Sequence, residues 1–334
     1  MKNKYLKIFE CCFPVKGRKN TVIIDPQRGE MYRFPNKYYQ YLELLNNNTF
    51  NTAEKKAINK IEFNFFIEFL VTNEIAFLTE HKKNFPSIST TFEEPVIISN
   101  AIIDTSTDSK YDIFSVIDQL NELGCRHIQF RFYDYKDEEF IFEILSKTHI
   151  ADKIHSIEII SKYNSKIKQN IYKKLNKKYL KLQSLIFHSA PKDELLHSLI
   201  VNNSSMMMVV FTKEEMLSEK DCGKISQDYF ITNSLYFILE SKSFNNCLNK
   251  KISIDKHGNI KNCPSMLKKY GNIKDTTLEE ALNEQGFKDL WNIKKDDIKV
   301  CQDCEFKFVC SDCRAYTVDN DLYGKPEKCE YSPI

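Results

Sequence analysis

The sixteen residues from Cys301 to Tyr316 read CQDCEFKFVCSDCRAY and contain four cysteines. These form two Cys-x2-Cys pairs, with five residues between the pairs. Because the chain can turn back within two residues, both thiolates of such a pair can bind one metal centre. This stretch therefore predicts a metal-binding loop around which the rest of the chain is organised.

Three further cysteines extend the pattern on both sides of this loop. Cys247 is followed by ten residues, Gly258, four residues and Cys263, while fifteen residues separate Cys313 from Cys329. Seven of the eleven cysteines thus fall within 83 of the 334 residues. Seven thiolates are more than one tetrahedral ion can bind, so the spacing predicts two metal centres.

Disulfides and zinc are the alternatives to iron–sulfur clusters. The chain begins MKNKYLKIFE, without the apolar run of a secretory signal, so we expect a cytoplasmic protein with reduced thiols. An odd number of clustered cysteines also disfavours a disulfide framework. Zinc could be bound by two Cys-x2-Cys pairs, but this would leave three of the seven thiolates unused. Iron–sulfur clusters use the full set better, and zinc stays the alternative.

Three stretches resemble the SPASM domain, the auxiliary-cluster domain of peptide-modifying radical S-adenosylmethionine (radical SAM) enzymes. They are CLNKKISIDKHGNIKNCPSM, CQDCEFKFVCSDCRAY and KPEKCEYSPI. The resemblance implies that one 4Fe–4S cluster is bound by Cys301, Cys304, Cys310 and Cys329. A second would be bound by Cys247, Cys263 and Cys313, with its fourth ligand unassigned. The family usually has three residues between its fifth and sixth cysteines, where this chain has Ser311 and Asp312.

Smaller features around the cysteines predict local structure. Residues 252–261 have the pattern of a hairpin that would bring the two flanking cysteines together. Thr277 and Glu280 form a capping box at the start of a helix. Arg314, directly after the second cysteine pair, is expected to donate to a cluster sulfur or an acidic substrate, with surface solvation as the alternative.

Residues 1–82 are predicted to form a small domain of their own. Val22–Asp25 and Glu30–Phe34 are expected strands on either side of a turn, and apolar residues then recur at helical spacing. Asn51 and Glu54 are expected to cap a helix. A hairpin, three helices and a closing strand at Glu74–Leu78 resemble winged-helix domains that bind a precursor's leader peptide as an added strand.

Residues 83–240 alternate apolar strands with helical patterns. Helices are expected near 113–120, 138–145 and 167–175, and strands at Val96–Ser99, Ile128–Phe132, Ile157–Ile160, Leu185–Phe187 and Met207–Phe211. Repeated strand–helix units predict the α/β class with a largely parallel sheet. The resemblance implies a degenerate or partial radical-SAM-like (β/α) barrel, followed by the cysteine-rich SPASM iron–sulfur domain at 241–334.

The barrel lacks the residues that radical SAM chemistry requires. The family binds its catalytic cluster through Cys-x3-Cys-x2-Cys in the loop after the first strand, expected here at 100–107. That segment reads NAIIDTST, and the motif occurs nowhere in the sequence. Residues 131–135, RFYDY, are bulky where the family's Gly-Gly-Glu-Pro segment approaches its ligand. We therefore expect no S-adenosylmethionine cofactor and no adenosyl-radical catalysis.

Composition gives no reason to expect nucleic acid or a membrane as a partner. The formal net charge is +2, and no apolar run has the length of a bilayer span. The chain has only eight glycines and no glycine-rich nucleotide-binding turn. A flavin- or nicotinamide-dependent enzyme is therefore not expected.

Nearly the whole chain resembles the SPASM-domain peptide maturases of grasp-with-spasm systems, which lack the radical SAM motif. The motifs that carry this resemblance are DCEFKFVCSDCRAY, ISIDKHGNIKNCPSM and IDPQRGEMYRFP. It implies a ribosomal precursor peptide and an ATP-grasp ligase as partners, without supplying a reaction. A cluster-dependent oxidoreductase acting on a peptide and a zinc-stabilised peptide-binding module without catalysis are the alternative functions.

Overall fold

The computed structural model describes residues 4–166, 175, 178–197, 207–232 and 234–333. Contacts divide the chain into two compact units. The first comprises residues 1–93, 224–246 and 292–334, and the second comprises residues 94–223 and 247–291. None of the described helices combines the length and apolar character of a membrane span. The predicted three-domain division stays a prediction.

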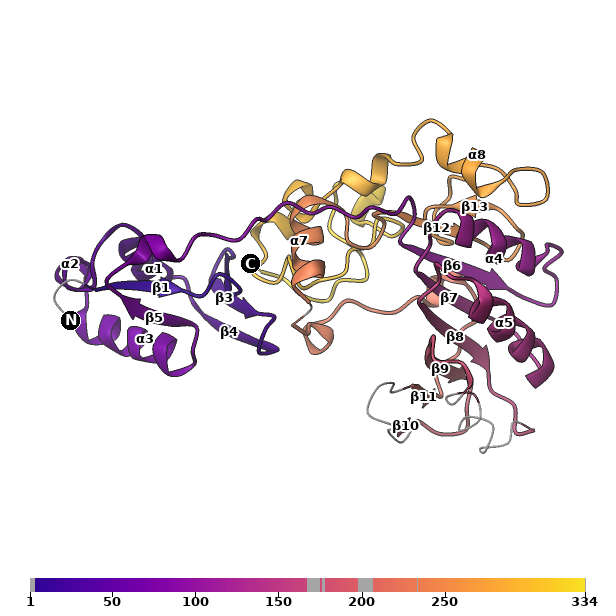
Figure 1. Cartoon of the computed structure of the whole chain (residues 1–334), viewed down its shortest axis with the longest axis horizontal. Coiled ribbons are helices and arrows are strands. Elements are labelled where there is room, and N and C mark those ends of the chain that lie inside the picture. The colour runs from indigo at the N-terminus through magenta and orange to yellow at the C-terminus, as the bar shows by residue number, and fades with distance from the viewer. Residues whose placement is uncertain (1–3, 167–174, 176–177, 198–206, 233, 334) are drawn as a thin grey trace. The chain divides into compact units, whose positions relative to one another are not determined.

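An eight-stranded sheet is the framework of the second unit (Figure 1), with the strand order β10-β11-β9-β8-β7-β6-β12-β13. The six strands between the two outermost ones are parallel, whereas β10 and β13 run antiparallel to their neighbours. This confirms the α/β class and the largely parallel sheet. The strands are β6 (Asn100–Thr105), β7 (His127–Phe132), β8 (Ser156–Lys162), β9 (Leu182–His188), β10 (Glu194–His197), β11 (Met208–Phe211), β12 (Lys251–Ile254) and β13 (Ile260–Lys261).

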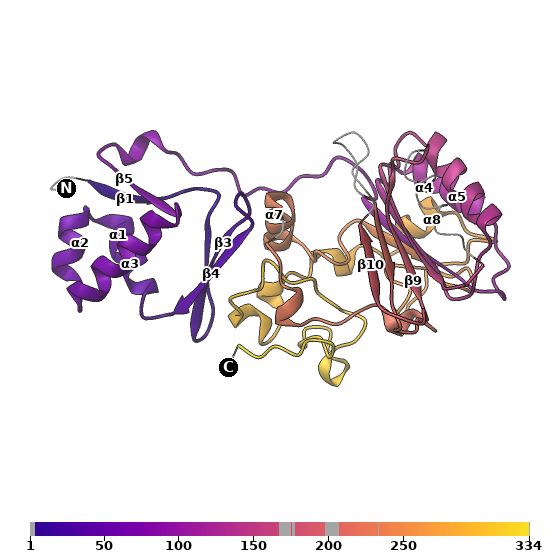
Figure 2. The same ribbon diagram turned by 90° about the horizontal axis from the view of Figure 1, so that it is seen from below.

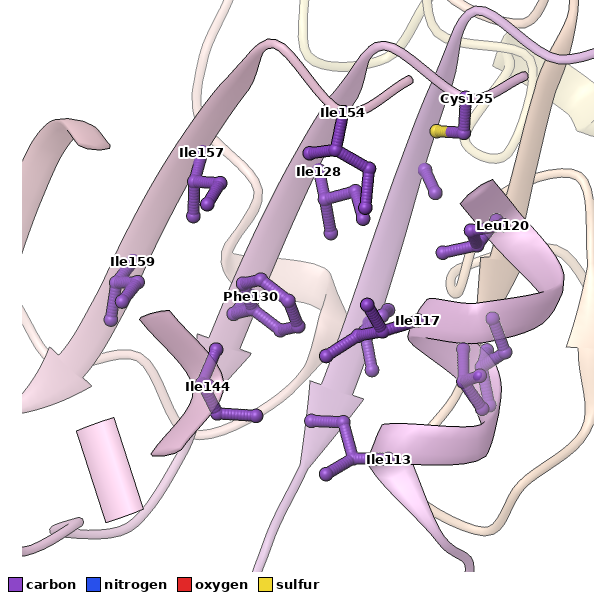
Figure 3. Packing of buried hydrophobic residues seen from close by; sticks show 14 of the residues in the cluster. Ile113, Ile117, Leu120, Cys125, Ile128, Phe130, Ile144, Ile154, Ile157 and Ile159 are labelled. Atoms are coloured by element: carbon purple, nitrogen blue, oxygen red, sulfur yellow. The ribbon is translucent and has the colours of Figure 1, made fainter. Parts of the chain in front are cut away.

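Helices α4 (Ile113–Glu122) and α5 (Glu138–Ile150) lie side by side on one face of this sheet (Figure 2). Helix α4 buries Ile113, Val116, Ile117 and Leu120, whose spacing puts them on one helix face. Figure 3 shows Ile117 and Ile144 next to Phe130 of β7 in the shared core. Burying each such side chain contributes about 1.5–3 kcal/mol, so these helices fix the sheet in place.

The first predicted strand of this unit is wrong. Val96–Ser99 lies outside the sheet, and β6 begins at Asn100 because that residue is the first to pair with both neighbouring strands. The segment expected as the first loop is therefore mostly a strand. The loop after β6 covers residues 106–112, reads STDSKYD and also contains no cysteine. Most of the predicted helix at 167–175 lies outside the described residues.

The first unit begins with two small antiparallel sheets and three helices. Strand β1 (Tyr5–Ile8) pairs with β5 (Ala76–Thr79), and the order in the second sheet is β2-β3-β4. The remaining elements are β2 (Phe13–Lys16), β3 (Asn20–Asp25), β4 (Glu30–Pro35), α1 (Tyr39–Asn47), α2 (Phe50–Lys56) and α3 (Lys60–Thr72). The predicted hairpin, helices and closing strand are thus present, while the winged-helix relationship stays a prediction.

The predicted helix cap at Asn51 is wrong. Helix α2 already includes Phe50, and its N-cap is Thr49. Phe50 is buried with its ring 5.7 Å from the ring of Phe63 in α3. Since packing against α3 draws Phe50 into the helix, tertiary contact moves the helix start upstream of the residue that local sequence favours.

The sheet β2-β3-β4 packs on the C-terminal cysteine loop within the first unit. Its buried side chains share a core with helix α7 (Leu235–Ser243) and with two apolar residues of the loop. The core consists of Phe13, Val15, Val22, Ile24, Ile238, Phe306 and Val309, and Cys304 lies against it. An N-terminal sheet therefore supports the segment that carries the cysteine pairs.

Candidate metal centre

Local backbone structure positions the first cysteine pair. Val300 has a positive φ of 67°, and a 3-10 turn at Cys301–Asp303 follows it. The Cys304 amide donates to the Cys301 carbonyl over 3.0 Å, and the Phe306 amide donates to the Cys304 sulfur over 3.4 Å. Amide donors to sulfur favour a thiolate, as metal-bound cysteines require.

Cys301, Cys304, Cys310 and Cys329 lie near one another in the first unit. Burial raises the pKa of Cys301 to about 12, and the charges of Cys310 and Cys329 add to this effect. Burial likewise raises the pKa of Cys304 to about 12, with Cys310 and Cys301 contributing. An isolated β-bridge pairs Cys329 with Ile225 of the same unit. The structure thus brings together the four cysteines expected to bind the first cluster.

The cysteines of this unit offer enough thiolates for a cluster or for zinc. In the described part of the chain, only Cys11, Cys12 and Asp25 form a group of at least three possible metal ligands with all ligand atoms within 4.8 Å of one another. Four thiolates can bind one tetrahedral zinc ion or one 4Fe–4S cluster. Iron as the metal of the C-terminal cysteines therefore stays a prediction.

A buried charge network holds the second cysteine pair. Asp312 lies between Cys310 and Cys313, and it accepts hydrogen bonds from Asn245 Nδ2 over 2.6 Å and Arg314 Nη2 over 2.8 Å. Lys295 Nζ donates to the Cys310 carbonyl over 3.0 Å. Burial opposes ionisation of Asp312, but the charges of Lys295 and Arg314 outweigh it and lower the pKa of Asp312. Asp312 therefore anchors the loop at the point where its spacing departs from the family pattern.

Arg314 is part of this anchor and is not solvated at the surface. Its side chain is buried, and Nη1 donates to the carbonyls of Leu322 and Gly324 over 2.8 Å each. The guanidinium thus joins the loop to the segment beyond it. Nothing in these contacts supports the expected donation to a cluster sulfur or a substrate.

Glu305 ties the cysteine loop to the N-terminal sheet. Its fully buried carboxylate accepts hydrogen bonds from Arg33 Nε over 3.2 Å and from the Tyr331 hydroxyl over 2.7 Å. At Gly17, a Cβ atom would stand 2.7 Å from the Glu305 amide nitrogen, so only glycine permits this approach. Sequence reasoning missed this contact because Arg33 and Glu305 are 272 residues apart.

We expect Arg33→Met to destabilise the first unit by about 2 kcal/mol, because it removes a charged donor from a buried carboxylate. Urea unfolding of the anaerobic protein measures the effect. Arg18→Met is the matched control, since Arg18 is exposed and the structure gives only its backbone a contact with the loop, through Asp303. Equal unfolding midpoints for the two variants would contradict the proposed support.

Cys247 and Cys263 are brought together in the second unit by the predicted hairpin. Strands β12 and β13 pair antiparallel, and Gly258 takes a positive φ of 85° in the turn between them. Burial and the neighbouring Cys247 raise the pKa of Cys263 to about 11, while Lys251 opposes this rise. Lys251 Nζ lies 3.7 Å from the Cys247 sulfur. Cys313 belongs to the first unit, and its place in this set stays a prediction.

An unpredicted ion pair closes the carboxyl ends of β6 and β7. Arg131 donates to both carboxylate oxygens of Asp104, over 2.6 and 2.7 Å, and the Tyr133 hydroxyl donates to the same carboxylate. Both charged side chains are almost fully buried. Asp104 and Arg131 are direct partners on adjacent parallel strands, a register that only the structure reveals. The bulky segment after β7 is therefore part of a satisfied polar network.

A family model matches part of the cysteine-rich segment. Residues 231–305 match the family model of SPASM, described as an iron-sulfur cluster-binding domain, so a SPASM domain is present. None of the curated proteins matches the chain.

Two solved structures of Streptococcus suis SuiB are similar at low identity. The structure bound to S-adenosylmethionine has 12% identity and a TM-score of 0.42, covering 98% of this chain and 100% of that chain. The structure bound to precursor peptide SuiA has 10% identity and a TM-score of 0.30, covering 99% of each chain. At these TM-scores we draw no conclusion from the likeness.

Proposed function

We propose that this chain is an iron–sulfur protein of ribosomal peptide maturation. It binds a precursor peptide and acts with an ATP-grasp ligase, without adenosyl-radical chemistry. The observation that carries the proposal is the gathering of Cys301, Cys304, Cys310 and Cys329, in a chain without the Cys-x3-Cys-x2-Cys motif. The SPASM match supports the cluster, and the grasp-with-spasm resemblance supports the partners.

The first cluster is assigned to the four gathered cysteines, and the second to Cys247, Cys263 and Cys313. When bound, such clusters hold the fold together and can accept or donate single electrons. In the first unit, Phe306 and Val309 exclude water on one side of the cysteine loop. Lys295 binds the Cys310 carbonyl, and Arg314 joins the loop to the segment beyond it, so both side chains help to hold the loop in shape.

Peptide binding is assigned to a groove beside β1 in the first unit. A cavity of about 530 Å³ is lined by residues 6–8 of β1, by Phe9 directly after it, and by Tyr39, Leu42 and Glu43 of α1. In the described part of the chain β1 pairs only with β5, so its other edge can accept a strand. A peptide would thus add to β1 and rest its side chains against α1.

Charge at this groove favours an acidic peptide segment. Lys7, Lys82 and Lys242 line the cavity together with Glu10 and Glu43. Burial lowers the pKa of Lys82, and the nearby charge of Lys7 lowers it further. Lys7 is already paired with Glu10, so a carboxylate of the peptide placed here would bind to Lys82 or Lys242.

We therefore expect Lys82→Glu to weaken precursor binding about ten-fold, which corresponds to about 1.4 kcal/mol. Fluorescence anisotropy of a labelled precursor measures the dissociation constant. Lys60→Glu is the matched charge reversal, because Lys60 is exposed and lies on α3 away from the cavity lining. Equal dissociation constants of the precursor for Lys82→Glu and Lys60→Glu would show that the peptide binds outside this groove.

The proposed function itself is tested by combining precursor, ATP-grasp ligase, ATP and this protein, and omitting each in turn. Mass spectrometry should show loss of water for each ester or amide link that forms only in the complete mixture. Cleavage of added S-adenosylmethionine is not expected. An identical product without this protein would reject a role in maturation.

A further inference from the structure

The groove beside β1 has a second wall, which lies after β5 in the chain. Ser87, Ile88 and Thr90 line the cavity of about 530 Å³ together with residues of β1 and α1. They belong to residues 87–91, which read SISTT and which we call the strap. All five residues are exposed and lie outside regular secondary structure. The strap therefore borders the groove without being packed into the core.

Aromatic contacts hold both ends of the strap within the first unit. Before it, the ring of Phe85 lies 4.8 Å from the ring of Phe77 in β5. After it, the buried ring of Phe92 lies 4.8 Å from the ring of Tyr236 in α7 and 5.9 Å from that of Phe244. Edge-on ring contacts of this kind are favourable. The strap is thus held beside the groove, while its exposed middle can adjust to a ligand.

A second cavity extends the groove along the segment that leads into the strap. It has a volume of about 740 Å³ and is lined by Tyr5, Lys7 and residues 80–87. Lys7, Lys82 and Ser87 line both cavities, so the two are parts of one groove that follows β1. Both volumes lie in the range of about 300–1,000 Å³ that is usual for ligand pockets, so the groove can hold an extended peptide segment.

The two walls of the groove both offer backbone groups for pairing. The Phe9 amide donates to the Ile75 carbonyl over 3.0 Å, and hydrogen-bonded residues alternate along an antiparallel pair. The backbone groups of Leu6 and Ile8 therefore point to the edge of β1 that faces away from β5. On the strap, the backbone amides of residues 87–90 have no hydrogen-bond partner among the described residues. A peptide strand between these walls would be paired on both of its edges.

We propose that the strap is the second half of the peptide site, an inference that rests on the proposed function. The precursor lies as a strand between β1 and the strap and pairs with both. Ile88 is the one large apolar residue of SISTT and lines the cavity, so it packs against an apolar side chain of the peptide. Lys82 and Lys242 line the same cavity and favour acidic side chains. The site thus selects an extended acidic segment with an apolar residue facing the strap.

Hydrogen–deuterium exchange of the full-length protein, with and without saturating synthetic precursor peptide, tests this pairing. The amides of residues 87–91 should exchange rapidly in the free protein. On binding, their exchange should slow by about ten-fold or more, together with that of the Leu6 and Ile8 amides. Residues 106–112, the loop after β6, belong to the second unit and serve as the reference whose exchange does not change.

Ile88→Ser should raise the dissociation constant of the precursor about ten-fold, because the apolar contact is lost. Ile58→Ser is the matched control, since Ile58 is 91% exposed in the same unit and lies outside the cavity lining. A bound precursor that leaves the exchange of residues 87–91 unchanged, or equal dissociation constants for the two variants, would overturn the role of the strap and leave the proposed function intact. A precursor that does not bind the wild-type protein would overturn both.

Discussion

Arg131→Met is expected to lower the free energy of unfolding of the second unit by about 3–5 kcal/mol. Arg131 is 2% exposed and Asp104 is 1% exposed, so the substitution leaves a carboxylate buried without its counter-charge. Typical domains have only about 5–15 kcal/mol of stability, and the loss would bring this unit close to unfolding at room temperature. Urea unfolding, monitored by circular dichroism, measures this loss of stability.

Two further variants show whether burial of the charged pair causes this loss of stability. Lys147→Met breaks an ion pair with Asp118 whose side chains are more exposed, and it should cost about 1 kcal/mol or less. The double variant Asp104→Leu/Arg131→Met removes both buried charges and should recover part of the loss. Similar losses of stability in Arg131→Met and Lys147→Met would contradict the role given to the Asp104–Arg131 pair.

Cys301→Ala/Cys304→Ala is expected to reduce bound iron from about eight to about four per chain, because it removes two of the four thiolates of the first cluster. Iron and sulfide analysis of the anaerobic protein measures the loss. The remaining signal should belong to the cluster of Cys247 and Cys263, whose thiols lie in the other unit.

Cys11→Ala/Cys12→Ala is the matched control, since it also removes two thiols from the first unit. Among the described residues, these two cysteines and Asp25 are the only group of at least three possible metal ligands whose ligand atoms all lie within 4.8 Å of one another. However, the Asp25 carboxylate is already bound by the side chain of Arg28 and by two backbone amides. The iron content of this variant should therefore equal that of the wild type. Loss of iron from this variant, but not from Cys301→Ala/Cys304→Ala, would reject the assigned ligands.

Local patterns in the sequence predicted most of the elements correctly. The capping box of Thr277 and Glu280 starts α8 (Leu278–Asn283), with the Glu280 amide donating to Thr277 Oγ1 over 3.2 Å. The hairpin before Cys263 follows from Gly258, and apolar runs gave the inner strands. Such features depend on a few neighbouring residues, which is why they can be predicted.

The features that the sequence did not predict depend on residues that are far apart in the chain. The start of β6 is set by its pairing with β7 and β12, and the start of α2 by packing of Phe50. The ion pairs Asp104–Arg131 and Glu305–Arg33 join residues that are 27 and 272 positions apart in the sequence.

The N-terminal sheet and the cysteine loop belong to one compact unit, and this links the proposed peptide groove to the first cluster. Residues that line the groove include Phe13 and Lys242, and both also lie beside the loop's aromatic residues. A peptide added to β1 would therefore rest on the same body that holds the cluster. The cluster's contribution to peptide binding would be to keep that body folded.

Metal analysis of the wild-type protein, purified and reconstituted without oxygen, tests the central claim most directly. The account predicts about eight irons and about eight sulfides per chain, with the visible absorption of iron–sulfur clusters. One or two zinc ions per chain, with neither iron nor sulfide, would contradict it.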